Sequence, residues 1–280
     1  MNPPDLYAFV LRLEAPHSRE RPTILGHHTQ ALFYELVRQI DPELSSALHR
    51  DVQNKPFTVA LHRLVVQELG GGHRVPIVEV RITLMQARLF STLTRALLAN
   101  QHRSAFMLAN TPLTLLEVCG TPERHPWAGF HSFAGIVEES KHQTVPARIG
   151  LQFVSPTAIG QGVRANGKPR HALLPTPELI FGSLARRWNE LCPPELQIGA
   201  EMLSAALTDT VVSKANIQTR LFQHQVGSAT QKGFEGECHY ELPSDPELAR
   251  ILVQLADAAF YLGIGIKTAR GMGQARRIMH

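Results

Sequence analysis

The spacing of apolar and polar residues predicts a strand, helix, strand, strand, helix, strand order for the first half of the chain. Leu6–Leu13 is rich in residues that favour strands, and apolar residues recur along one helical face through His28–Ile40. Asp41 and Pro42 end that helix and begin a short second one, with Asp41 as N-cap and Pro42 at the first helical position. The remaining elements of this half are expected at Phe57–Leu61, Val78–Leu84, Leu89–Leu97 and Leu113–Cys119.

The same order recurs in the second half. A strand at Ile149–Val154 precedes a long excursion rich in glycine and basic residues, and Ser244 and Glu247 form a capping box before the last helix. The other predicted elements are helices at Pro177–Leu191 and Glu247–Leu262 and strands at Ile217–His224, Phe234–Leu242 and Gln274–Met279. Two βαββαβ units in tandem are typical of paired ferredoxin-like folds. We therefore predict the α+β class, with two tandem ferredoxin-like (RRM-like) domains.

The length of 280 residues suits two domains of ordinary size. We place the first, which carries the candidate catalytic residues, at 1–122 and the second at 147–280. The stretch Thr121–Pro146 has no sustained apolar period and contains three prolines, so it is expected to connect the two.

The composition is that of a globular protein, with 44% hydrophobic and 19% charged residues. The longest apolar stretch, Leu255–Ile266, is too short to cross a membrane and is interrupted by polar residues and glycine. No secretion signal is visible at the beginning of the chain, and the three cysteines lie far apart. We expect a cytoplasmic protein without membrane contact, whose cysteines are buried thiols.

Positive charge is concentrated near the end of the sequence. The net charge of +4 points only weakly to a polyanionic partner. Lys267, Arg270, Arg276 and Arg277 fall in a stretch that contains no acidic residue, which makes a local basic end.

A glycine-rich motif, Gly263-Ile264-Gly265-Ile266-Lys267-Thr268-Ala269-Arg270-Gly271-Met272-Gly273, lies in this basic end. Phosphate-binding loops of nucleotide-binding folds follow a strand and begin a helix, whereas this motif follows a helix and leads into a strand. A helix C-cap followed by a turn would need only one glycine. Four glycines interleaved with two cations favour close contact with an RNA backbone. The predicted RNA-binding residues, including cations of the excursion, are Gly263, Gly265, Lys267, Arg270, Gly271, Gly273, Arg164, Lys168 and Arg170.

The glycine-rich ending resembles that of the RAMP superfamily of CRISPR-associated proteins. More specifically, the chain resembles the precursor CRISPR-RNA processing endoribonucleases. The resemblance covers most of the sequence and is carried by Leu48-His49, Lys55-Pro56-Phe57-Thr58-Val59 and Gly233-Phe234-Glu235-Gly236 with Tyr240. It implies that the partner is CRISPR repeat RNA, and that further effector-complex subunits or a second copy of the chain are additional partners.

RNA carries its own nucleophile, the 2′-hydroxyl beside each phosphate, so cleavage needs only positioning and proton transfer. Histidine suits this role because its pKa lies near neutrality. By position alone, His49 fits an ordinary surface histidine at a helix C-terminus. The resemblance implies that His49 is catalytic, and that Tyr34, His28 and Lys55 are candidates for assisting it. The position of each of these three in the sequence fits an ordinary solvent-facing residue equally well. Tyr34 is expected on a polar helix stripe with His27 and Arg38.

A metal site is not expected, since the 14 histidines include no zinc-binding motif, and no cofactor is implied.

Our leading hypothesis is an endoribonuclease that leaves a 2′,3′-cyclic phosphate and a 5′-hydroxyl. One alternative is a non-catalytic RAMP-like subunit that holds guide RNA. Another is an RNA-binding module of the RRM type, which lacks support because no RNP1-like strand is visible.

Overall fold

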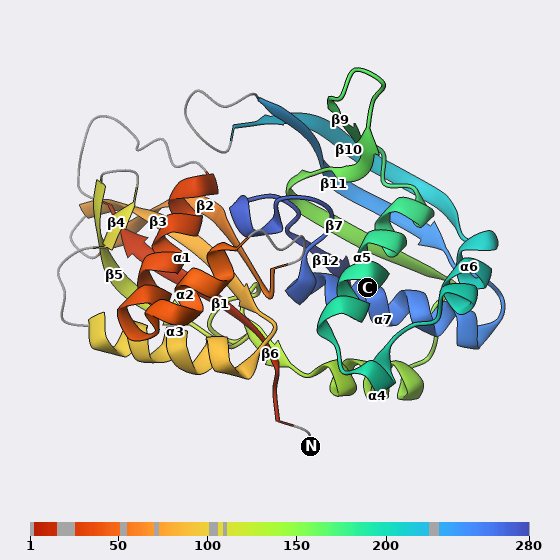
Figure 1. The fold of residues 1–280 in the computed structure, drawn as a ribbon, viewed down its shortest axis with the longest axis horizontal. Coiled ribbons are helices and arrows are strands. Elements are labelled where there is room, and N and C mark those ends of the chain that lie inside the picture. Colours follow the sequence, from red (N-terminus) through yellow and green to blue (C-terminus); the bar gives the residue numbers. More distant parts are fainter. Residues whose placement is uncertain are drawn as a thin grey trace.

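A computed structural model describes residues 3–15, 26–50, 55–69, 73–100, 106–108, 111–223 and 230–279. In the first half, an antiparallel sheet has the order β2-β3-β1-β5. The short strands β4 and β6 pair with β5 and β1 respectively, and helices α1, α2 and α3 belong to the same half (Figure 1). The bounds are β1 Leu6–Glu14, α1 Gly26–Ile40, α2 Pro42–His49, β2 Phe57–Leu69, β3 His73–Leu84, α3 Ala87–Asn100, β4 Phe106–Leu108, β5 Thr111–Cys119 and β6 Gly129–His131.

The second half repeats this topology. Its sheet has the order β10-β11-β7-β12, so in both halves the second and third main strands form a hairpin and the first lies between the third and the last. The bounds are β7 Arg148–Thr157, β8 Ile159–Val163, β9 Pro169–Ala172, α5 Pro177–Leu191, α6 Ala200–Thr208, β10 Val211–Phe222, β11 Gln231–Glu241, α7 Pro246–Leu262 and β12 Ala275–Ile278. The predicted fold class, two tandem ferredoxin-like units, is confirmed.

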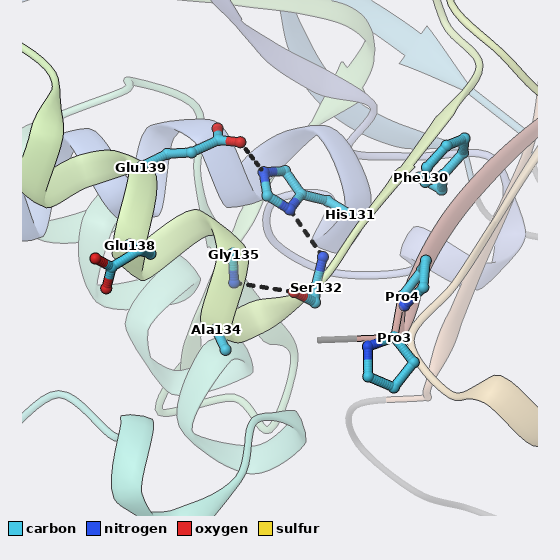
Figure 2. Close-up of a pocket in the computed structure, with 9 residues that line it drawn as sticks. All are labelled: Pro3, Pro4, Phe130, His131, Ser132, Ala134, Gly135, Glu138 and Glu139. Carbon is cyan, nitrogen blue, oxygen red and sulfur yellow. Dashed lines mark hydrogen bonds and ion pairs between the residues drawn. The ribbon is translucent and has the colours of Figure 1, made fainter. Parts of the chain in front are cut away.

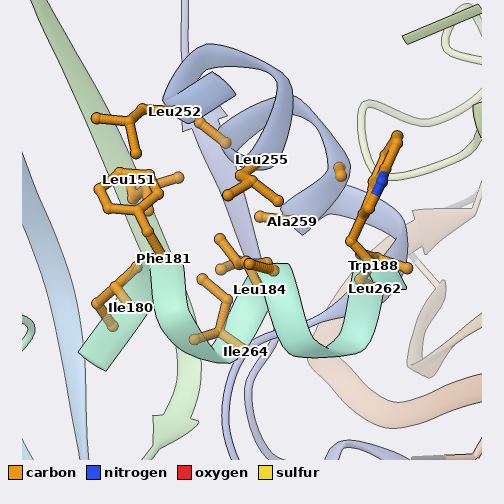
Figure 3. Close-up of a cluster of buried hydrophobic side chains, with 14 of the residues drawn as sticks. Leu151, Ile180, Phe181, Leu184, Trp188, Leu252, Leu255, Ala259, Leu262 and Ile264 are labelled. Atoms are coloured by element: carbon orange, nitrogen blue, oxygen red, sulfur yellow. The ribbon is translucent and has the colours of Figure 1, made fainter. Parts of the chain in front are cut away.

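Helices α5 and α7 pack on each other in the core of the second half (Figure 3). Ile180, Leu184 and Trp188 recur every fourth residue of α5, so their side chains share one face, and all three are fully buried. Burial of each such side chain stabilises the fold by about 1.5–3 kcal/mol. Ile264, just after α7, is buried in the same cluster, which fixes the start of the glycine-rich segment.

The stretch Thr121–Pro146 does more than connect the two halves. It contains β6, which pairs with β1 of the first sheet, and helix α4 (Phe133–His142), which packs against α7 of the second half. Ser132 caps α4, since its Oγ accepts a hydrogen bond of 2.9 Å from the backbone N–H of Gly135. The sequence pattern gave no sign of these elements, and the domain limits 1–122 and 147–280 stay a prediction.

The two predicted helix starts have different outcomes. At α2, Asp41 is the N-cap and accepts from the N–H of Leu44 at 2.9 Å, as expected. At α7, the predicted capping box is wrong, because Asp245 is the N-cap and Pro246 is the first helical residue. The described part of β10 ends at Phe222, and His224, the predicted end of that strand, lies outside the described residues.

The cysteine prediction is confirmed, since Cys119, Cys192 and Cys238 are all free and buried. Burial raises the pKa of the Cys119 and Cys192 thiols to about 11. Among the residues that the structure describes, none of the helices combines the length and apolar character needed to span a bilayer.

Candidate active site

Helix α2 carries His49 as its last residue. The Asp41 cap and Pro42 fix where this helix begins, and it has only 8 residues, so its C-terminus presents an exposed His49 ring. Residues 51–54, which follow, lie outside the described part of the chain.

Tyr34 of α1 packs directly on His49. Their ring centroids are 3.7 Å apart with an angle of 34° between the planes, and the Tyr34 hydroxyl donates to the carbonyl of Leu48 at 3.1 Å. Tyr34 is only 8% exposed, so the predicted polar-stripe position is wrong: α2 packs against α1 and covers the ring. Burial raises the pKa of Tyr34, and the nearby Arg270 opposes that rise. The phenol is therefore neutral near pH 7.

Lys55, which follows α2 in the sequence, contacts the same helix end. Its Nζ donates to the carbonyls of Leu48 at 2.5 Å and Arg50 at 3.0 Å. Carbonyls at a helix C-terminus lack partners within the helix, and a cation there also interacts favourably with the helix dipole. Tyr34 and Lys55 thus share one acceptor, the Leu48 carbonyl, and hold the peptide that precedes His49.

His28 lies apart from this group. It is near the beginning of α1, six residues before Tyr34, which corresponds to about 9 Å along the helix axis. Its ring centroid is 3.8 Å from that of His27, and burial, followed by the charge of His27, lowers the pKa of His28. The structure therefore brings together Tyr34, His49 and Lys55, and places His28 nearer the beginning of α1.

The glycine-rich segment of the second half reaches this site. It leads from α7 to β12 and lies between the two halves of the molecule, as the blue chain in Figure 1 shows. The N–H of Gly271 donates to the carbonyl of Val59 in β2 at 2.9 Å, and Arg270 Nε donates to Gln30 Oε1 in α1 at 3.1 Å. These contacts bring the Arg270 guanidinium close to Tyr34.

The glycines of this segment are required by the protein's own backbone. Gly265 and Gly273 have φ of 84° and 74°, in the left-handed region that favours glycine. A Cβ at Gly265 would lie 2.3 Å from the Ala158 carbonyl oxygen, and one at Gly273 would lie 2.2 Å from that of Ile264. Gly263, Gly271 and Gly273 are buried within the protein. Direct approach of RNA to these glycines stays a prediction, and the structure supplies a separate reason for their presence.

Lys267 is the one non-glycine with positive φ, 54°, among the residues described. Such a conformation is uncommon for a side chain of this kind and is often found at functional sites. Burial, and then the charge of Arg270, lowers the pKa of Lys267. The two cations of the segment therefore lie close enough for their charges to interact.

The candidate cations of the excursion lie on the hairpin β8–β9, which projects from the second half in Figure 1. Arg164, Lys168 and Arg170 are exposed there. Burial lowers the pKa of His171 on β9, and the charges of Lys267 and Arg164 lower it further. Positive charge thus extends from the hairpin through Lys267 to Arg270, which lies near Tyr34.

Comparison with known families connects this geometry to an activity. Residues 6–138 match the model of the CRISPR Cas6 N-terminal domain, and residues 151–275 match that of the CRISPR-associated endoribonuclease Cas6. Together these ranges cover most of the chain. The protein belongs to the Cas6 family. It is therefore a Cas6-type endoribonuclease, and the family that the sequence resembled is confirmed.

Solved Cas6 structures are similar over nearly the whole chain. A product complex of Thermus thermophilus Cas6 (TTHB231) has 28% sequence identity and a TM-score of 0.82, covering 99% of this chain and 100% of that one. A product complex of another Cas6 (TTHA0078) has 27% identity and a TM-score of 0.74, covering 98% and 99%. A RAMP protein that binds different RNA substrates shares 14% identity and a TM-score of 0.60, which supports the fold alone. No curated protein sequence matches.

Elsewhere in this Cas6 protein, His62, Glu79 and His125 form a cluster that the sequence did not reveal, because its members are far apart along the chain. Their possible ligand atoms all lie within 4.8 Å of one another. Both Glu79 oxygens are already paired with guanidinium groups, Oε2 with Arg63 at 2.5 Å and Oε1 with Arg12 at 3.5 Å. This arrangement favours a buried ion-pair cluster over a cation site. The sequence-based expectation of no metal stays a prediction.

A pocket of about 910 Å³ lies at the start of α4 and is lined by residues such as Pro4, Phe130 and Glu138 (Figure 2). A serine, a histidine and a glutamate meet there, but not as a catalytic triad. His131 Nδ1 accepts from the backbone N–H of Ser132 at 2.8 Å, whereas the Ser132 hydroxyl oxygen caps the helix. None of the candidate catalytic residues lines this pocket.

Proposed function

We propose that this Cas6 protein cuts CRISPR repeat RNA within the precursor transcript, without a metal ion, and leaves a 2′,3′-cyclic phosphate and a 5′-hydroxyl. The observation that carries the proposal is the convergence of Tyr34 and Lys55 on the helix end that presents His49, with Arg270 of the other half near Tyr34. The related Thermus thermophilus enzyme, which has been solved as a product complex, supports an RNA substrate for this chain as well.

In this mechanism the 2′-oxygen attacks the adjacent phosphorus, and the bond from phosphorus to the 5′-oxygen breaks. The 2′-hydroxyl loses a proton and the leaving 5′-oxygen gains one. His49 is the group that transfers a proton at these oxygens, because it is exposed at the helix end and imidazole accepts and donates protons near neutral pH. Proton transfer of this kind typically contributes about 10²–10⁴-fold to the rate.

The neighbouring residues act in different ways. Arg270 is exposed and stabilises the negative charge that develops on the phosphate oxygens. Tyr34 acts as a platform that orients His49, because its hydroxyl proton is donated to a carbonyl and its raised pKa prevents it from serving as a base. At least two of the three Lys55 donors are bound to carbonyls, which assigns Lys55 mainly to positioning. Lys267 and the hairpin cations Arg164, Lys168 and Arg170 bind the RNA backbone.

The alternative, a subunit that holds guide RNA without cutting it, shares the same cations but has no need of a histidine held in this way. Association with other subunits of an effector complex, or with a second copy of the chain, stays a prediction.

A pair of repeat oligonucleotides tests the mechanism. One is all RNA and the other carries a single 2′-deoxy substitution immediately 5′ of the scissile phosphate. We expect cleavage of the first, with a 2′,3′-cyclic phosphate and a 5′-hydroxyl at the new ends, and binding without cleavage of the second. Equal cleavage of both would point to attack by water, and cleavage of neither would favour the non-catalytic subunit.

A further inference from the structure

Helix α5, in the second half of the chain, makes polar contacts with both parts of the candidate active site. The backbone N–H of Gly265 donates to Ser183 Oγ at 3.0 Å, so α5 holds the glycine-rich segment. One turn later on the same face, Arg187 Nη2 donates to the carbonyl of Lys55 at 2.8 Å and more weakly to that of Phe57 at 3.4 Å. Lys55 and Phe57 belong to the first half, in the segment that leads into β2.

Arg187 is only 3% exposed. Burial lowers its pKa to about 10, yet the guanidinium still carries its charge at neutral pH. Burying a guanidinium is costly unless its donors find acceptors, and here these acceptors include backbone carbonyls of the other half. On the adjoining face of the same helix, Ile180, Leu184 and Trp188 are packed in the core, as Figure 3 shows, so α5 is a rigid support.

The segment that Arg187 holds is continuous with the group around His49. The Lys55 carbonyl accepts from Arg187, while Lys55 Nζ donates to Leu48 and Arg50 at the end of α2. Between the two carbonyls that Arg187 contacts, the carbonyl of Pro56 accepts from the N–H of Met85 at 3.0 Å. A small shift of this segment would therefore move Lys55 Nζ and, with it, the peptide that orients His49.

We infer that Arg187 is a positioning residue for RNA cleavage, which ties the Lys55 segment of the first half to the helix that also holds the glycine-rich segment. This inference rests on the proposed function of His49 and Lys55. Arg187 is buried away from the RNA; it fixes the distance between the residues that orient His49 and the cations that bind the substrate.

The test measures single-turnover cleavage of repeat RNA at saturating protein, together with RNA affinity and thermal unfolding. Because misplacement of a catalytic group by about 1 Å can cost 10²-fold, we expect Arg187→Met to slow cleavage by about 10- to 100-fold. RNA affinity should change little. Trp188→Phe is the matched control, since it removes the hydrogen bond of the adjacent side chain to the Leu196 carbonyl without touching the Lys55 segment. It should lower thermal stability and leave the cleavage rate near that of the wild type.

A double-mutant cycle separates positioning from general stability. In a Lys55→Ala background, the Arg187→Met change should slow cleavage much less than in the wild type, because the side chain through which it acts is gone. If Arg187→Met does not fold, Arg187→Lys, which keeps the charge but cannot span two carbonyls, enters the same cycle. Equal loss of rate in both backgrounds, or a loss no larger than that of Trp188→Phe, would overturn the inference. Wild-type cleavage by His49→Ala would instead refute the proposed function, which makes the two failures distinguishable.

Discussion

The ring of Tyr34 lies against that of His49 although the two residues belong to different helices and are separated by the turn at Asp41. The Tyr34 hydroxyl donates to the carbonyl of Leu48, the residue immediately before His49, so the ring contact and the hydrogen bond act on adjacent residues. Fixing the side chain of a surface histidine in one rotamer costs conformational entropy, and without the contact to Tyr34 few interactions would offset that cost. The tyrosine therefore restricts His49 before the RNA arrives.

We expect His49→Ala to slow single-turnover cleavage by about 10²-fold or more, because proton transfer at the reacting oxygens is lost. RNA affinity should be nearly unchanged, since the proposed phosphate contacts lie elsewhere. His142→Ala is a matched control, because His142 is likewise the exposed last residue of a helix, α4, and is paired with Glu138. A wild-type rate for His49→Ala would remove this residue from the mechanism.

Two substitutions at Tyr34 separate its two contacts with the helix end. Tyr34→Phe keeps the ring on His49 and loses one hydrogen bond, so we expect a modest loss of stability of about 1 kcal/mol and a loss of rate smaller than that of His49→Ala. Tyr34→Leu removes the stacking surface as well and should slow cleavage further. Rates and chemical unfolding of the two variants check this order. If Tyr34→Phe were as slow as His49→Ala, the hydroxyl itself would take part in the reaction.

The sequence predicted the fold well because both halves carry clear periodicities. Alternating strands and amphipathic helices appear in the same order twice, and the observed sheets follow that order. Other elements were missed for a physical reason: β6 has only three residues, too few for an alternation to stand out, and α4 lies in a stretch without a sustained apolar period. The α7 start was misassigned by one residue, because Asp245 followed by Pro246 competes with Ser244 as a cap.

Less of the candidate site could be predicted. Tyr34, His49 and Lys55 were singled out through a family resemblance, and sequence spacing could not show that α2 would cover Tyr34. Arg187 was missed, although it left a signal: it stands three residues after Leu184 and four before Leu191, within the apolar stripe of α5. A cation in such a stripe needs a buried partner, but its partners are backbone carbonyls of another domain, which no local pattern reveals.

Removal of divalent metals should leave cleavage unchanged. The proposed nucleophile is the RNA 2′-hydroxyl, and Glu79, the one acid in the cluster with His62 and His125, is paired with Arg12 and Arg63. We expect equal single-turnover rates with excess EDTA and with magnesium. The ionic strength must be matched, because screening of the phosphate contacts alters affinity. A rate that falls in EDTA and returns on addition of magnesium or manganese would contradict the metal-independent mechanism.

Lys267→Ala and Arg270→Ala should weaken RNA binding and reduce its dependence on salt. Each lost phosphate contact lowers the slope of log affinity against log salt by about 0.7–0.9. Lys141→Ala is the control, since this exposed lysine of α4 is paired with Glu138 and should leave the slope unchanged. Arg270→Ala should also slow cleavage, because Arg270 lies beside Tyr34. Titrations at several salt concentrations measure the slope, and an unchanged slope for both variants would exclude these residues from the RNA interface.

Replacing a glycine by alanine should have opposite effects on thermal stability in the glycine-rich segment and in helix α5. Gly265→Ala would place a methyl group 2.3 Å from the Ala158 carbonyl oxygen and force a side chain into a backbone conformation with φ of 84°. The nearby backbone must shift, so we expect a loss of thermal stability and a change in RNA affinity as Lys267 and Arg270 move.

Gly182→Ala is the control, because Gly182 lies inside α5 and an added Cβ there meets no atom within 4 Å. Alanine favours a helix interior over glycine by about 0.5–1 kcal/mol, so this variant should gain stability. Calorimetry of the two variants checks the signs. If Gly265→Ala unfolded at the wild-type temperature but lost RNA affinity, the glycine would serve RNA contact directly and not the fold of the segment.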